Sequence, residues 1–158
     1  MTGRERLERA IHEAGHAVAA LALGIPVHGV TIRSDRDSHG CTRIADEGSL
    51  EARAIVRLAG PIALAMHGLP ASGCGRDLRE ARALAAELDT DTDRLLDELR
   101  TRTCALLFDR DRSRELGAVT LALLERDTLT GTELASALLL AATPRRGVGG
   151  WLRRPRGR

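Results

Sequence analysis

This 158-residue sequence contains almost no aromatic residues: Phe108 and Trp151 are the whole set, and tyrosine is absent. Its hydrophobic fraction of 43% comes mainly from alanine, leucine, valine and isoleucine. Because alanine and leucine are strong helix formers, a core of this composition favours helices. The length suits one domain with a sizeable core. With only two aromatic side chains, the chain also lacks the stacking platforms of single-strand nucleic-acid binding proteins.

Lysine is absent as well, so all 24 basic residues are arginine. Six arginines and no acidic residue follow Thr143, whereas the preceding residues carry 18 arginines against 22 Asp and Glu. We therefore predict one folded domain over residues 1–143 and a disordered Arg- and Gly-rich tail over residues 144–158. Such a tail predicts at most a weak contact with an acidic surface, and no specific nucleic-acid recognition.

Cysteines are few, and long apolar runs are missing. Cys41, Cys74 and Cys104 are odd in number and widely spaced, so we expect no disulfide framework, which favours a reducing cytoplasm. No stretch reaches about 18 uncharged apolar residues, so no membrane span is predicted. His12 and Glu13 interrupt the first apolar run, which argues against a signal peptide.

The periodicity of the apolar residues predicts a mainly α (α+β) domain. Thr2 and Glu5 have capping-box spacing and open a helix that Gly24 and Pro26 stop. Alternation over residues 27–33 predicts a strand, and residues 40–45 a returning strand, giving a small hairpin or a two-to-three-stranded sheet. Further helices are expected over residues 49–66 with a kink or break at Pro61, about 76–88, about 92–108, about 113–126 and, after a second capping box, up to about 142.

The most specific pattern is H-E-x-x-H, at His12-Glu13-Ala14-Gly15-His16 within the first predicted helix. Residues i and i+4 lie on one helix face, so both imidazoles can bind one metal ion. The intervening glutamate can reach a water on that metal and act as its general base. The pattern predicts a zinc hydrolase, most often a metallopeptidase. The competing interpretation is a pair of hydrogen-bonded core histidines.

A catalytic zinc normally takes three protein ligands and a water, so one ligand is still missing. Asp77 is favoured on physical grounds, because a carboxylate in the first turn of a helix is held rigidly and is stabilised by the helix dipole. Taken alone, it is more simply an ordinary helix N-terminal carboxylate. The full set of candidates is His28, His39, His67, Cys74, Asp77 and Glu80.

Beyond this motif, much of the chain resembles the peptidase domain of the FtsH-type AAA zinc metalloproteases. The resemblance runs from about residue 11 to residue 140 and rests on several segments. They are His12-Glu13-Ala14-Gly15-His16-Ala17, Val27-His28-Gly29-Val30-Thr31-Ile32, Gly40-Cys41-Thr42, Leu58-Ala59-Gly60-Pro61-Ile62-Ala63, Ser72-Gly73-Cys74-Gly75-Arg76-Asp77-Leu78, and residues 123–134.

The resemblance implies that His12, His16 and Asp77 bind Zn²⁺ and that Glu13 is the catalytic carboxylate. It also implies that residues 40–44 form an edge strand facing the substrate. The sequence departs from the family in three ways: Pro61 replaces a glycine, the acidic residue that follows is lost, and no Walker A motif, AAA module or membrane anchor is present. A stand-alone peptidase domain is therefore expected, with ATP-driven unfolding in doubt.

We thus expect a zinc-dependent endopeptidase that hydrolyses unfolded or extended polypeptides with a zinc-activated water and a glutamate general base. A separate ATPase or unfoldase is a possible partner, and monomer and homo-oligomer both stay open. The alternative is a catalytically silent peptidase-like module that holds a partner on its edge strand, with zinc as a structural element. Hydrolysis of a non-peptide bond stays open too, because H-E-x-x-H prepares a water without selecting the bond.

Overall fold

The protein is described by a computed structural model that covers residues 2–33, 40–45, 47–71 and 73–142. Within these ranges the chain is mainly helical, with one small antiparallel sheet, which confirms the predicted fold class. The predicted tail over residues 144–158 lies outside the described residues, so the domain boundary stays a prediction. None of the described helices is long and apolar enough to cross a membrane.

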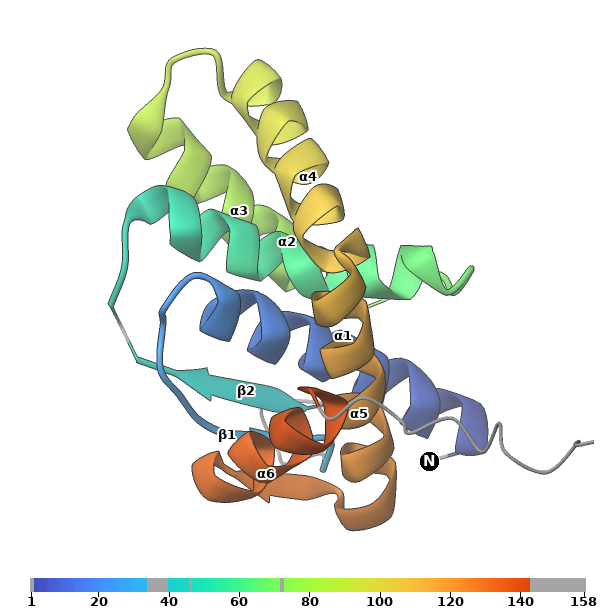
Figure 1. The fold of residues 1–158 in the computed structure, drawn as a ribbon. Helices are drawn as coiled ribbons and strands as arrows, with labels where there is room; N and C mark the ends of the chain where they lie inside the picture. The colour runs from blue at the N-terminus through green and yellow to red at the C-terminus, as the bar shows by residue number, and fades with distance from the viewer. Residues whose placement is uncertain (1, 34–39, 46, 72, 143–158) are drawn as a thin grey trace, which may run out of the picture.

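Helix α1 (Gly3–Ala22) lies near the centre of the molecule, between the sheet and a group of three helices (Figure 1). Thr2 and Glu5 form the predicted capping box: the Thr2 hydroxyl accepts from the Glu5 backbone N–H, and the Glu5 carboxylate accepts from the Thr2 N–H. From Ala10 to Ala20 this helix is buried on nearly every side. Its small side chains allow neighbouring helices to approach closely.

The sheet has the strand order β2-β1-β3, and both pairings are antiparallel. Strand β1 (Val27–Thr31) is central, and β2 (Cys41–Ile44) forms one edge. The other edge, β3 (Thr128–Thr130), escaped the sequence analysis, because a three-residue strand is too short to show an alternating pattern. Leu129 of β3 pairs with Val30 of β1, so a segment that follows α5 joins the strand that follows α1.

Helices α2 (Leu50–Met66), α3 (Gly75–Leu88) and α4 (Thr92–Phe108) pack beside one another on one side of α1 (Figure 1). They share a second apolar core made of Ala54, Ile55, Leu58, Ala81, Ala85, Leu96 and Leu99. The single described aromatic residue, Phe108, is two-thirds exposed. Both cores among the described residues are therefore aliphatic, as the composition predicts.

Helix α5 (Arg110–Arg126) packs against α1 from another side, and α6 (Gly131–Ala142) completes the fold beside β3. The sequence analysis started α5 about three residues too late. Asp109 ends α4 and also caps α5 by accepting from the N–H groups of Asp111 and Arg112, so no loop separates the two helices. We expected a kink or break at Pro61, but α2 runs from Leu50 to Met66 as one helix with Pro61 inside it, so there is no break.

Candidate metal centre

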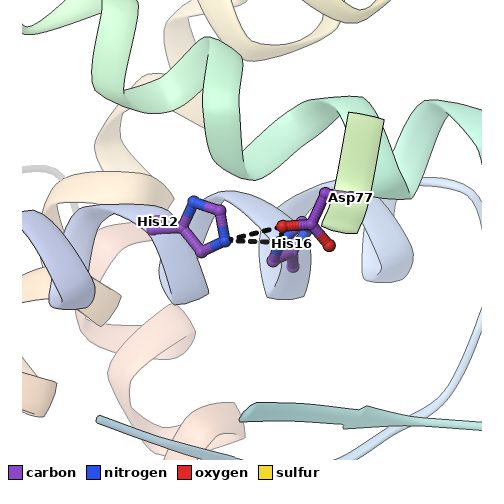
Figure 2. Close-up of side chains that lie close together, drawn as sticks. All are labelled: His12, His16 and Asp77. Atoms are coloured by element: carbon purple, nitrogen blue, oxygen red, sulfur yellow. Dashed lines mark hydrogen bonds and ion pairs between the residues drawn. The ribbon is translucent and has the colours of Figure 1, made fainter. Parts of the chain in front are cut away.

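His12 and His16 lie one turn apart on α1, and their rings meet edge to face with centroids 4.6 Å apart (Figure 2). The two Nε2 atoms are 3.0 Å apart. His16 is buried, and the His12 side chain is 16% exposed. The i, i+4 spacing therefore places two ring nitrogens at one point on the helix, open to the surface on the His12 side.

Asp77 reaches the same point from the first turn of α3. Its Oδ2 atom lies 3.1 Å from His12 Nε2 and 3.6 Å from His16 Nε2 (Figure 2). Ligand atoms around a tetrahedral zinc, each about 2.0–2.2 Å from the ion, are separated by roughly 3.3–3.6 Å. The three separations of 3.0, 3.1 and 3.6 Å lie within about 0.3 Å of that range, so the donor set fits a zinc ion.

Charge reinforces this cluster. Burial by itself raises the pKa of Asp77, but hydrogen bonds and charge from His12 and His16 outweigh it and hold the pKa well below its ordinary value of 3.8. Burial by itself lowers the pKa of each histidine, and the Asp77 carboxylate outweighs it and raises both above 6.5. The site is thus built around an ionised carboxylate, the state that binds a cation.

Both histidines are oriented through their second ring nitrogen. His16 Nδ1 donates to the Val56 carbonyl oxygen on α2 at 2.6 Å, so in the neutral ring it is Nε2 that carries no proton and can bind a metal. His12 Nδ1 lies 3.6 Å from Cys74 Sγ at the start of α3. Because the thiol faces Nδ1, it lies on the side of the ring opposite the candidate ligand atom. Nothing in the sequence pattern pointed to either contact.

A close crossing of α1 and α2 depends on two glycines. A Cβ atom at Gly60 would come within 2.5 Å of His16 Nε2 and within 2.7 Å of His12 Cε1. A Cβ atom at Gly15 would come within 2.7 Å of the Ala59 carbonyl oxygen. Only glycine leaves the room that these contacts need, so α2 can lie directly over the two rings.

The other candidate ligands lie elsewhere. Glu80 pairs with Arg57, with Arg57 Nε 2.9 Å from Glu80 Oε2, and it also pairs with Arg76. His28 and His67 are exposed, and neither belongs to the cluster formed by His12, His16 and Asp77, the group with metal-ligand geometry among the described residues. His39 falls outside the described residues. The structure thus brings the three preferred ligands together, and their roles as ligands stay predictions.

Glu13 is buried, with 7% of its surface exposed, and points toward strand β2. Its Oε2 accepts a hydrogen bond from the Thr42 hydroxyl at 2.8 Å, while the missing side chain of Gly40 leaves space for Oε1. Glu13, Gly40 and Thr42 line the same cavity as the three candidate ligands, and its volume is about 550 Å³. The Glu13 carboxylate, the candidate ligand cluster and residues of β2, an edge strand among the described strands, therefore line one cavity.

Two comparisons with known proteins cover this part of the chain. The peptidase M50B-like family profile matches residues 5–88, a range that contains the histidines, Glu13 and Asp77. A curated relative, the ATP-dependent zinc metalloprotease FtsH 1 of Sorangium cellulosum (strain So ce56), is 40% identical over 106 residues, which cover 57% of this chain. The match covers only 16% of that relative's length.

These two matches support a metallopeptidase-related domain, which is a coarser statement than the FtsH-type stand-alone domain that the motifs predict. Zinc is named for the relative, and a metal is implied for the family. The profile covers more than half of the sequence, including every residue of the candidate centre. The chain therefore belongs to the peptidase M50B-like family, as a zinc metallopeptidase-related domain.

Proposed function

We propose that this chain is a zinc-dependent endopeptidase in which His12, His16 and Asp77 hold the metal and Glu13 is the general base. One observation carries the proposal: Nε2 of each histidine and Oδ2 of Asp77 form a triangle with edges of 3.0–3.6 Å, beside a buried glutamate. Two imidazoles and one carboxylate leave a coordination position open, as catalytic zinc sites require.

A zinc ion held by these three residues would supply the positive charge that lowers the pKa of a bound water and polarises a peptide carbonyl. Glu13 accepts the proton of the attacking water and passes it to the amine that leaves. The Val56 carbonyl holds the His16 ring in the tautomer that exposes Nε2 to the cleft. In this proposal Glu13 transfers the proton, and the Val56 carbonyl orients the His16 ring.

The position of β2 at the edge of the sheet supports the proposal that the substrate is a polypeptide. The strand pairs with β1 on one side, and the described residues contain no strand pairing with its other side. An extended peptide adding to that edge would be held mainly through main-chain hydrogen bonds, so the proposed specificity is broad. Cys41 and Arg43 of β2 are exposed, whereas Thr42 and Ile44 are partly buried.

The proposal extends to an FtsH-like way of working on unfolded chains. These 158 residues contain no lysine, and the Walker A phosphate site requires one. We therefore propose that folded substrates reach the cleft only after an ATPase outside these residues has unfolded them. Loose peptides and unstructured ends need no such help. A cytoplasmic location fits the cysteine pattern and stays a prediction.

The test combines zinc content with cleavage. The wild type should contain one zinc per chain by elemental analysis and should cleave casein, whereas Glu13→Gln should keep the zinc and lose cleavage. A zinc-free wild type refutes the whole scheme. Zinc binding without cleavage of casein or a peptide library, by either protein, would instead favour a binding module that uses β2 to hold a partner.

A further inference from the structure

The hydroxyl of Thr42 makes two contacts with the same residue of α1. It lies 2.8 Å from Glu13 Oε2 and 3.0 Å from the Glu13 carbonyl oxygen. One contact engages the end of the side chain and the other its backbone, so the pair restricts how the glutamate side chain can rotate. A carboxylate this deeply buried needs such a donor, because an unpaired buried charge is costly.

Thr42 also belongs to the strand on which the substrate is proposed to bind. It is the second residue of β2, and its pairing partner in β1 is Val30. The alternation of the strand turns Thr42 and Ile44 inward while Cys41 and Arg43 stay exposed. A peptide adding to the side of β2 that faces away from β1 would therefore lie beside the residue whose hydroxyl holds Glu13.

The two carboxylate oxygens have different surroundings. Oε2 is bound by Thr42, whereas a Cβ atom at Gly40 would come within 2.7 Å of Oε1. The glycine keeps this space open at the start of the strand, in the cavity shared with the candidate ligands. Thr42 therefore forms its hydrogen bond with Oε2 of Glu13, and Oε1 is the oxygen that could accept a proton from the attacking water.

We propose that Thr42 is a positioning residue, which couples the peptide-binding edge strand to the general base by fixing the Glu13 carboxylate through its hydroxyl. The inference rests on the proposed function and adds that the turnover of bound peptide depends on the Thr42 hydroxyl. If a merely structural threonine occupied this position, its hydroxyl would affect stability and leave the turnover of bound peptide unchanged.

The kinetic test uses three variants of the full chain loaded with zinc. Thr42→Val removes the hydroxyl at nearly constant volume and should lower kcat by roughly 10–100-fold, part of the 10²–10⁴-fold that general-base catalysis supplies. KM and zinc content should change less than about threefold. Thr42→Ser keeps the hydroxyl and should recover most of the lost kcat.

Thr31→Val is the matched control. Thr31 is also a partly buried threonine of this sheet, but its hydroxyl contacts Thr128 Oγ1 at 2.7 Å. Its loss should lower the denaturation midpoint and leave kcat within about twofold of the wild type. Equal kcat for Thr42→Val and the wild type would overturn the inference while the proposed function stands.

A double-mutant cycle in urea gives a readout that needs no activity. Thr42→Val should lower the unfolding midpoint in the wild-type background and lower it by less than half as much in the Glu13→Ala background. If the two shifts are equal, Thr42 does not hold the carboxylate and the inference fails, whatever the activity. A wild type that cleaves nothing refutes the proposed function separately, and with it the catalytic part of the inference.

Discussion

Replacing Gly60 with alanine should weaken zinc binding more than it weakens the fold. The added Cβ would lie 2.5 Å from His16 Nε2, whereas ordinary contacts of this kind begin at 3.4 Å. The ring or the helix must therefore move by about 0.9 Å, and metal–ligand distances tolerate only about ±0.2 Å. By analogy with other changes next to metal ligands, we expect zinc affinity to fall roughly 10–100-fold, or about 1.4–2.7 kcal/mol.

The effect on the metal-free fold should be smaller, because two contributions oppose each other. Overpacking typically costs about 1–3 kcal/mol, whereas alanine in a helix is favoured over glycine by about 0.5–1 kcal/mol. Two glycine variants separate these contributions. Gly117→Ala in α5 meets nothing within 4 Å and should stabilise the fold without changing zinc affinity. Gly15→Ala meets the Ala59 carbonyl oxygen and should destabilise the crossing of α1 and α2.

The assay is competition for zinc with a chromogenic chelator, together with thermal unfolding with and without zinc. Zinc bound only by the folded state raises the unfolding free energy according to its affinity, so weaker binding should appear in both measurements. If Gly60→Ala binds zinc as tightly as Gly117→Ala does, the two rings do not form the metal site in this arrangement, and the reasoning fails.

Further predictions concern the ligand set, the pH and the metal itself. Asp77→Asn should lower zinc affinity by at least about tenfold, whereas Glu80→Gln, one turn later on α3, should stay within a few-fold; the reverse order by chelator competition would make Glu80 the ligand. In the metal-free protein, the raised pKa values of His12 and His16 should stabilise the fold fully below pH 6.5, and this stabilisation should decrease as the pH rises through their folded-state pKa values. The lowered pKa of Asp77 should stabilise the fold at higher pH, and this stabilisation should be lost as the pH falls below about 3.8. Urea unfolding midpoints measured between pH 3 and pH 9 test both dependences. Chelation of zinc should lower the thermal midpoint of the wild type, and a midpoint that is the same with and without chelator would contradict a zinc site linked to folding.

Much of the fold could be predicted, because its signals are local. The predicted bounds of α4 match the observed ones, and α2 and α3 begin within one residue of their predicted starts. One error arose where structure depends on a distant partner: strand β3 exists because Leu129 pairs with Val30 across the chain, and no short window of sequence contains both residues. The other error was local, because Asp109 ends α4 and also caps α5, and the sequence analysis placed a gap between the two helices.

In the candidate centre too, the sequence predicted local relations better than distant ones. His12 and His16 could be placed together from their spacing alone, since one helix turn determines it. Asp77 lies on another helix. Its place in the first turn of that helix favoured it among six candidates, but only the family resemblance made it a ligand rather than an ordinary N-terminal carboxylate. In the structure its carboxylate lies within 3.6 Å of both rings.

The supporting contacts were beyond sequence analysis for a further reason. Three features support the centre: the Val56 carbonyl, the Thr42 hydroxyl and the space above Gly60. Such groups occur in every protein, and these act on the centre only because α1, α2 and β2 pack together in the folded chain. The motif therefore specifies which atoms can bind a metal, while the crossing of α1 and α2 decides whether those atoms are held in place. Variants at Gly60 and Thr42 should consequently lose function while every residue of H-E-x-x-H remains intact.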